Sequence, residues 1–452
     1  MKRWLLALGA VIALGGAWYA WRAYWRVEAP ILVGILHSKT GPLAISEQSM
    51  IDAELMAIDE INQRGGLLGR EVKPIIADGR SDPRVFAQEA RRLIETEKVS
   101  VIFGCWTSLC RRSVKSVVEP SNHLLFFPSN YEGMDIPSSI VCTGPIPNQQ
   151  VIPAVNWCFE TLRARKFFLA GSQDIQSYSV NALINDQLKA LGAQLVGEKY
   201  VALDGTGMPD MIAAVKAAGP DVVLSTVIGD GNKPFYQQLA QGGLTSARLP
   251  VLSFTIAEDE LRELPVKEMV GDYTAWSYFQ SIDSPVNRAF VQRFKGHYGS
   301  ERTTSDSIVA AYNSVKLWAQ AVDESGTEST SDVRRAIRRQ SLDAPEGVVS
   351  IDAETLHTWR PFYLGKIRGD GQFEVVWSLE KPVRPVPYPV LRSRADWDAF
   401  VERLYTTWGT NEFNPQTVTD SPEPVPALTR RPVPGAPKAA VSSVRKSRSY
   451  QR

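Results

Sequence analysis

The sequence predicts an α/β protein whose parallel sheets are covered by helices on both faces, and three observations lead to this fold class. Apolar runs of strand length alternate with amphipathic segments of helix length along most of the chain. This alternation is typical of parallel sheets, in which a helix connects one strand to the next. At 452 residues the chain is too long for one ordinary core, and the alternation falls into two sets that meet near residue 147. Two doubly wound parallel-sheet lobes are therefore expected.

The first set begins with a buried strand at residues 31–38. The helix that follows carries apolar residues at helical spacing until Gly65 and Gly66 end it. Further strands are expected at 71–79, 99–104 and 123–129, and further helices at 84–98 and 108–119. Strands and helices thus alternate up to the turn-rich stretch around residue 147, which suits a crossover between lobes.

The second set repeats this alternation and then changes to longer helices. Strands are expected at 166–172, 194–203, 221–229 and 249–255, with helices at 179–192, 208–219 and 233–243. Longer helices are expected at 284–299, 305–326 and 329–340. A strand region at 362–379 closes the fold, and Gly369, Asp370 and Gly371 within it mark a hairpin turn.

The N-terminus carries a targeting pattern. Lys2 and Arg3 precede residues 4–21, which contain no charge and are typical of an export signal or a membrane anchor. The aromatic residues around its end, with Arg22 and Arg26, favour an uncleaved anchor over a removed signal peptide. A helix buried in the fold would need a partner for every face. We therefore expect the body to be periplasmic or otherwise extracytoplasmic, tethered to the inner membrane if residues 4–21 are not removed.

The C-terminal end has a different composition. From about residue 414 onward, Pro, Ser and Arg dominate and few residues could form a core. Residues 414–452 are therefore expected to be a disordered tail.

Several classes of function are disfavoured. The net charge of +1 gives no electrostatic reason to expect nucleic acid. The chain contains no GxGxxG, P-loop or GxSxG pattern and no clustered Cys/His set, so no cofactor and no metal are expected. Cys105 or Cys110 with His123 would supply a nucleophile and a base, but the sequence indicates no oxyanion site or orienting acid to accompany them. We therefore expect a protein that is not an enzyme.

The four cysteines leave alternatives open. Cys105, Cys110, Cys142 and Cys158 allow three complete disulfide pairings, and one disulfide is compatible with an exported protein. Buried free thiols are the default expectation.

Five predicted strands end in small or hydroxyl-bearing residues, at the sheet edge where open α/β folds bind ligands. The candidate ligand-binding residues lie at these ends or beside them: Trp106, Ser108, Phe127, Ser129, Asn130, Tyr131, Glu132, Gln173, Asp174, Tyr178, Thr226, Asp230, Thr255 and Trp276. For any one of them a structural alternative stands. A polar residue before a helix is commonly an N-cap, and a lone aromatic commonly packs in the core.

Three short stretches then indicate a family. "GCWTS" at 104–108, "NYEG" at 130–133 and "PNQQ" at 147–150 resemble the urea- and short-chain-amide-binding proteins of ABC importers. These belong to the type I periplasmic binding proteins, near the branched-chain amino-acid binders. The resemblance runs from about residue 31 to 389. It implies two lobes joined by three crossovers, with a ligand clamped between them.

The resemblance also implies lobe boundaries and ligand contacts. The expected division is 1–30 signal or anchor, 31–147 plus 256–346 first lobe, 148–255 plus 347–400 second lobe, and 414–452 tail. Hinges are expected near residues 147, 255 and 346. In the family, residues matching Ser108 and Ser129 hold the amide, Phe127 matches an aromatic at the site, and Glu132 matches the glutamate of "YEG".

One segment departs from the family pattern. Where members carry aromatic residues and Pro-Arg, residues 171–181 read "GSQDIQSYSVN", with Gln173 and Asp174 at the site and Tyr178 displaced along the chain. This more polar wall favours a ligand with more hydrogen-bonding groups than urea, such as a cation paired with Asp174.

The expected function is that of an ABC importer's solute-binding protein, which closes its lobes around urea, a short-chain amide or a related small polar solute. Its partners would be that solute and a membrane permease. The alternative is a membrane-tethered sensor with the same pocket that signals to a partner, which the N-terminal segment favours. An amide hydrolase is disfavoured because a nucleophile motif is missing.

Overall fold

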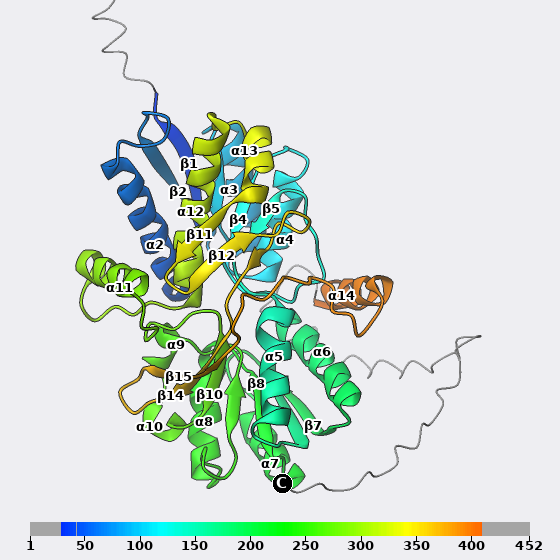
Figure 1. Cartoon of the computed structure of the whole chain (residues 1–452). Helices are drawn as coiled ribbons and strands as arrows, with labels where there is room; N and C mark the ends of the chain where they lie inside the picture. Colours follow the sequence, from blue (N-terminus) through cyan, green and yellow to red (C-terminus); the bar gives the residue numbers. More distant parts are fainter. Residues whose placement is uncertain (1–28, 42, 409–452) are drawn as a thin grey trace, which may run out of the picture. The chain divides into compact units, whose positions relative to one another are not determined.

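The computed structural model describes residues 29–41 and 43–408 (Figure 1). The predicted apolar N-terminal segment and the predicted tail both lie outside these residues. Within them, no helix has the length and apolar character needed to cross a membrane. The described residues contain three sheets, and the two larger ones form the cores of the two lobes.

The sheet of the first lobe is parallel throughout, with strand order β2-β1-β3-β4-β5. Its strands are β1 (Ile31–His37), β2 (Val72–Asp78), β3 (Ile102–Gly104), β4 (Leu125–Phe127) and β5 (Ile140–Cys142). Side chains on one face, such as Ile35 and Phe103, pack with α2 (Ala44–Gln63), α11 (Pro285–Tyr298) and α12 (Asp306–Ser325). Those on the other face, such as Leu36 and Leu125, pack with α3 (Pro83–Glu95) and α4 (Ser108–Val118).

The sheet of the second lobe has the order β15-β14-β10-β9-β8-β6-β7. Its parallel strands are β6 (Lys166–Ser172), β7 (Gln194–Val201), β8 (Val222–Thr226), β9 (Val251–Ser253) and β10 (Tyr273–Trp276). The hairpin of β14 (Tyr363–Ile367) and β15 (Phe373–Ser378) adds two antiparallel strands. One face packs with α5 (Pro147–Glu160) and α6 (Ile175–Leu191), and the other with α7 (Met208–Ala218) and α8 (Asn232–Gln241).

Smaller elements complete the described chain. A three-stranded antiparallel sheet, which the sequence pattern did not predict, consists of β11 (Ser341–Ala344), β12 (Gly347–Ile351) and β13 (Thr358–Trp359). The remaining helices are α9 (Glu258–Leu261), α10 (Val266–Met269), α13 (Thr330–Ala336), α14 (Arg394–Trp408) and the short 3₁₀ turns η1 (Gly229–Gly231) and η2 (Ile337–Arg339).

Strand pairing moves two of the expected lobe boundaries. The boundary at 255 is wrong because β10 pairs in parallel with β9, which keeps the chain in the second lobe as far as Trp276. The boundary at 346 is also wrong, because Ile351 and Leu356 pack in the core of the first lobe. The chain therefore passes between the lobes after β5, after β10 and after β13.

A buried ion cluster joins these three crossing points. The Arg360 guanidinium, which follows β13, donates to the Thr143 carbonyl after β5 at 2.9 Å. It also donates to Asp306 at 2.9 Å and to Glu346 at 3.1 Å. Asp306 in turn accepts a bond of 3.0 Å from the backbone N–H of Ser277, the residue after β10. The Arg360 side chain thus connects, directly or through Asp306, the three segments at which the chain crosses between the lobes.

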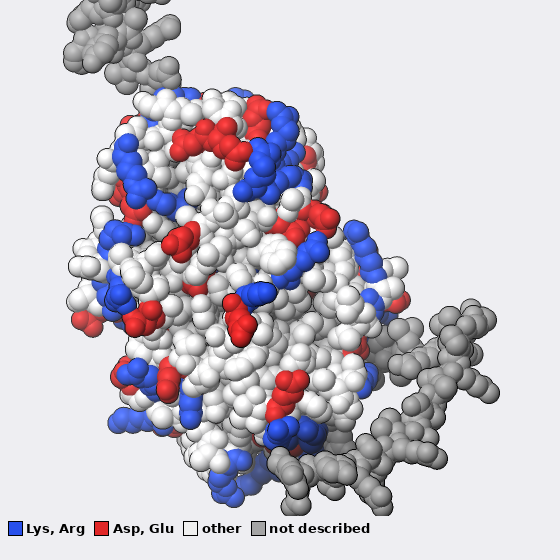
Figure 2. Space-filling model, in the orientation of Figure 1, with Lys and Arg blue, Asp and Glu red and all other residues white. Residues whose placement is uncertain are grey.

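Charges on the molecular surface are mixed. On the face drawn in Figure 2, Lys and Arg side chains are interspersed with Asp and Glu, and no broad patch of one sign is visible. This pattern fits the net charge of +1 and gives no basic surface on that face for nucleic acid.

Candidate functional site

The first wall of the candidate site forms where β3 ends and α4 begins. Thr107 is the N-cap of α4, and its side chain accepts a hydrogen bond of 3.2 Å from the backbone N–H of Cys110. Ser108, the first residue of the helix, donates through Oγ to Glu132. Both side chains are buried, so two residues predicted for the ligand site are in direct contact.

Glu132 is the centre of this polar cluster. Its Oε1 accepts a hydrogen bond of 2.9 Å from the Tyr405 hydroxyl and lies 3.8 Å from a guanidinium nitrogen of Arg111. Arg111 is itself buried and donates to Asp135 at 2.7 Å. A carboxylate in such surroundings is held in one orientation, which is what a ligand contact needs.

Tyr131 and Phe127 pack inside the first lobe. Nδ1 of His357 lies 2.8 Å from the Thr355 carbonyl oxygen and donates to it, and burial lowers the pKa of His357 to about 4, so Nε2 of the neutral ring accepts a bond of 2.6 Å from the Tyr131 hydroxyl. The Phe127 ring meets the Tyr131 ring edge-on at 5.7 Å, and both are fully buried. The core-packing alternative therefore describes how these two rings are held, while ligand contact stays a prediction.

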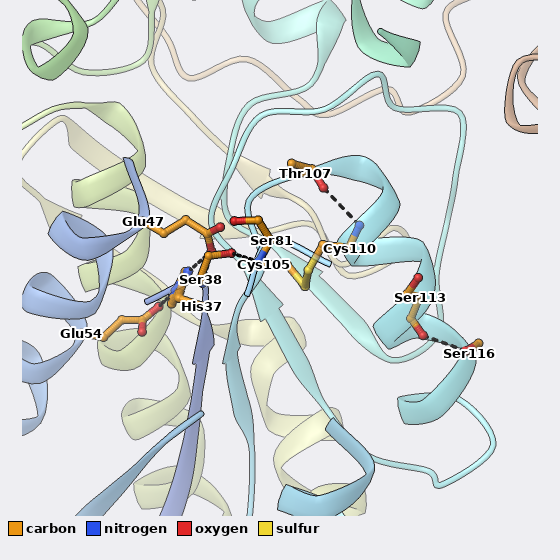
Figure 3. Close-up of a disulfide and its surroundings, with 10 residues drawn as sticks. All are labelled: His37, Ser38, Glu47, Glu54, Ser81, Cys105, Thr107, Cys110, Ser113 and Ser116. Atoms are coloured by element: carbon orange, nitrogen blue, oxygen red, sulfur yellow. Dashed lines mark hydrogen bonds and ion pairs between the residues drawn. A yellow bond between two sulfur atoms is a disulfide. The ribbon is translucent and has the colours of Figure 1, made fainter. Parts of the chain in front are cut away.

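A disulfide closes the loop that carries Ser108 (Figure 3). Cys105 and Cys110 are bonded, with Cα atoms 5.7 Å apart, so the expectation of free thiols is wrong for this pair. Cys142 and Cys158, both within the described residues, remain buried thiols as expected. At Gly104, with φ of +149°, an added Cβ would lie 1.9 Å from the Leu36 carbonyl oxygen. The backbone therefore turns at Gly104, where β3 ends, and the Cys105–Cys110 disulfide fixes the loop that follows.

The second wall comes from the start of α6. Asp174 is the N-cap of this helix and accepts a hydrogen bond of 2.9 Å from the backbone N–H of Ser177, and another from the Ser177 hydroxyl. Burial raises the pKa of Asp174 to about 6, and the negative charge of Glu132 adds to the rise. Asp174 is thus a buried acceptor at the start of α6, as Glu132 is in the loop after β4.

Other second-lobe candidates gather around this cap. The Tyr178 ring stacks on Tyr200 with ring centres 3.9 Å apart. The Ser177 hydroxyl donates to the Thr226 carbonyl at 2.8 Å. The sequence places Ser177 in the polar segment 171–181 but not among the candidate binding residues, and its contacts with Asp174 and Thr226 become visible only in the structure.

The remaining candidates are less closely connected. Thr255 donates to the Val227 carbonyl at 2.6 Å and the Trp276 indole to the Ile256 carbonyl at 2.8 Å, which are structural bonds within the second lobe. Asn130 bonds Gln150 at 3.5 Å. Ser129 is buried, Trp106 and Gln173 are half-buried, and Asp230 is exposed in η1.

A buried charged triad supports the same edge of the first sheet (Figure 3). His37, at the end of β1, contacts Glu47 at 2.9 Å through Nδ1 and Glu54 at 3.1 Å through Nε2. Burial alone would lower the pKa of His37, but the two carboxylates outweigh it and raise that pKa to about 10. Sequence reasoning missed this triad because its members come from separate elements. Among the described residues no group of three or more His, Cys, Asp or Glu is arranged to hold a metal ion.

A cavity of about 570 Å³ lies between α4, the loop after β4 and α14. Glu132 and Tyr405 both line it. Arg111, Lys115 and Asp135 contribute further charges, and Asp135 pairs with both cations. The C-terminal helix therefore reaches a residue of the candidate site, which no sequence pattern indicated.

Comparison with known proteins identifies the family. A family model described as "Periplasmic binding protein domain" matches residues 31–394. The chain belongs to this periplasmic binding protein family. Helix α14, apart from its first residue, lies beyond the matched part.

Individual relatives agree with this assignment. The Leu/Ile/Val-binding protein homolog 7 of Brucella suis is 23% identical over 373 residues, which cover 76% of this chain and 88% of that protein. A shorter stretch of 121 residues is 31% identical to a limonene hydroxylase of Geobacillus stearothermophilus; it covers 27% of this chain and only 22% of that protein.

Solved structures show the same fold. The solute binding protein of an ABC transporter from Rhodopseudomonas palustris HaA2, in complex with p-hydroxybenzoic acid, superposes with a TM-score of 0.71 at 21% identity; the match covers 79% of this chain and 98% of that one. The leucine binding protein LivK from Thermotoga maritima gives a TM-score of 0.66 at 16% identity, over 77% of this chain and 98% of that one.

These matches confirm the predicted fold class and the resemblance to type I periplasmic binding proteins near the branched-chain amino-acid binders. The periplasmic binding protein described here is a solute-binding protein of the ABC-transporter type, and its family implies a periplasmic location. The family consists of binding proteins rather than enzymes, in agreement with the prediction that this chain is not an enzyme.

Proposed function

We propose that this protein binds a small polar solute rich in N–H donors, such as urea, a short-chain amide or a cationic relative of these, and delivers it to an ABC permease. The observation that carries the proposal is the pair of buried carboxylates that follow β4 in the first lobe and β6 in the second. Glu132 is held by Ser108 in the first lobe, and Asp174 caps α6 in the second. Both accept hydrogen bonds, and N–H groups are the matching donors.

The two carboxylates also bear on the charge of the ligand. An anionic ligand such as a benzoate would meet two buried negative groups, whereas an uncharged amide or a cation would be attracted. The structural relative that binds p-hydroxybenzoic acid shares 21% identity, which supports the fold and not its ligand. A hydrogen bond to a charged group contributes about 1.5–3 kcal/mol, so each carboxylate should matter measurably for affinity.

Ligand size sets an upper limit on affinity. At roughly 1.5 kcal/mol per non-hydrogen atom, urea would gain no more than about 6 kcal/mol. This corresponds to a dissociation constant on the order of tens of micromolar. Submicromolar binding would therefore favour a larger solute of the same chemical class.

Closure of the lobes is the proposed mechanism. The chain passes between the lobes at three points, next to Thr143, Ser277 and Arg360. A solute that contacts both lobes stabilises the closed arrangement, because only there can it bond to Glu132 and Asp174 together.

The second candidate is a membrane-tethered sensor with the same pocket. The observation in its favour is the uncharged segment at residues 4–21 between Lys2, Arg3 and Arg22. Extraction of membranes with alkaline carbonate tests the tether that this candidate requires: retention of a full-length chain supports it, and release of a shortened chain excludes it.

Ligand screening by calorimetry and thermal shift tests the main proposal. The full chain would be titrated with urea, acetamide, guanidinium chloride, putrescine, leucine and p-hydroxybenzoate. We expect binding of at least one N–H-rich compound, and its loss in Glu132→Gln and Asp174→Asn. Asp221→Asn is the matched control, because Asp221 likewise accepts backbone N–H bonds, from Arg165 and Lys166, at the end of β6 opposite to Asp174. Binding of p-hydroxybenzoate alone, or of none of the compounds, would overturn the proposal.

A further inference from the structure

Helix α14 is an addition to the family domain that touches both lobes. The family match ends at residue 394, where α14 (Arg394–Trp408) begins. Figure 1 shows this helix beside α6 of the second lobe, and the two helices are in contact. Its far end reaches α4 of the first lobe. A segment attached to both lobes can restrain the movement of one lobe against the other.

The attachment to the second lobe is largely buried. Arg392, just before the helix, pairs with Asp186 of α6 and lies over the Trp397 ring at 4.4 Å. Trp397 is fully buried, and its indole donates to the Pro389 carbonyl at 2.8 Å. The Arg392–Asp186 pair, with both side chains mostly buried, and the contact of α14 with α6 form this attachment.

The attachment to the first lobe is polar and combines an exposed ion pair with a buried hydrogen bond. Arg112 of α4 donates to Glu402 at 2.7 Å, with side chains 45% and 63% exposed. The same guanidinium lies over the Tyr405 ring at 4.1 Å. Tyr405 donates in turn to Glu132 of the candidate site. The exposed ion pair contributes little to stability, whereas the bond from Tyr405 to Glu132 is buried and is the stronger of the first-lobe contacts.

We propose that α14 is a strap that stays on the second lobe and grips the first through Arg112 and Glu132, so that it restrains movement of one lobe against the other. The first-lobe contacts are polar and include a weak, exposed ion pair, so we expect the strap to separate from the first lobe and to stay on the second. The strap restrains the ligand-free protein whatever the solute, so it goes beyond the proposed function. Its bond to Glu132 places the restraint at the residue proposed to bind the ligand.

Pulsed electron spin resonance on the ligand-free full chain tests the strap. Spin labels would replace two exposed lysines, Lys73 on β2 of the first lobe and Lys216 on α7 of the second, and the distance between the lobes would be measured. We expect Arg112→Ala combined with Tyr405→Phe to broaden or shift the distance distribution. The control Arg84→Ala removes a comparable exposed pair, with Asp82, at the start of α3, and should leave the distribution unchanged.

A charge exchange keeps the test decisive if the truncated side chains disturb folding. Arg112→Glu alone should widen the distribution, and Arg112→Glu with Glu402→Arg should return it towards that of the unaltered chain. Identical distributions in all variants would overturn the strap. Because no solute is added, this result is independent of whether the ligand screen succeeds.

Discussion

Replacement of Arg360 by methionine tests the buried cluster that links the three crossing points. Arg360 donates to Thr143, Asp306 and Glu346, and its side chain is fully buried. Arg360→Met keeps much of the apolar volume but leaves two buried carboxylates without their cation. Removing one partner of a buried ion pair costs about 3–5 kcal/mol, and this loss corresponds to a fall in melting temperature on the order of 10 °C.

Thermal unfolding followed by circular dichroism measures this effect. Arg368→Met is the matched control, because Arg368 pairs with Asp370 in an exposed position and should change the stability by about 1 kcal/mol or less. Arg360→Lys should fall between the two, since one ammonium group cannot reproduce the guanidinium's several fixed bonds. A melting temperature for Arg360→Met equal to that of Arg368→Met would refute the reasoning.

The pH dependence gives a second readout of the same variant. Burial already raises the pKa of Asp306 and of Glu346 in the folded protein, and loss of Arg360 raises both further. A carboxyl group whose folded pKa lies above its unfolded pKa destabilises the fold once it ionises. The fall in melting temperature caused by Arg360→Met should therefore be smaller at pH 5 than at pH 8.

Three further outcomes are expected. Cys105→Ser with Cys110→Ser opens a very short loop and should lower the stability by about 2 kcal/mol in thermal melts, whereas Cys158→Ser leaves the disulfide intact. The pKa of His37 is raised to about 10, so its stabilising contribution is complete below about pH 6.5 and is lost as the pH rises towards 10; the melting temperature should fall over that range more steeply than in His37→Gln. Tyr405→Phe removes a hydroxyl that competes with the ligand for hydrogen bonding to Glu132. It should therefore tighten binding of urea or acetamide several-fold in calorimetry. Weaker binding would contradict the proposal that the strap acts on the ligand site through Glu132.

The sequence predicts most of the two large sheets because their strands are continuous apolar runs followed by helices with a clear apolar stripe. β5, Ile140–Cys142, was missed because the apolar run around it is short and follows a stretch without apolar spacing, whereas β3 and β4 lie within longer apolar runs. The hairpin of β11 and β12 was missed because the exposed Val348 and the polar residues around it hide the alternation. Short strands depend on pairing with a neighbour, which a local pattern does not record.

The candidate site divides in the same way. The strand ends that carry Ser108 and Asp174 could be located, because parallel strands bring their carboxyl ends to one edge. The contact of Tyr405 with Glu132 spans 273 residues of sequence and depends on how α14 folds back. The disulfide was left open because spacing alone does not choose among the pairings of four cysteines.

The order of elements along the chain has a consequence for biosynthesis. The five strands of the first sheet are complete by Cys142, but α12, which covers one of its faces, begins only at Asp306. The second sheet likewise gains β14 and β15 only after Tyr363. Neither half can bury its interior until most of the polypeptide has left the ribosome, and such long-range pairing folds slowly.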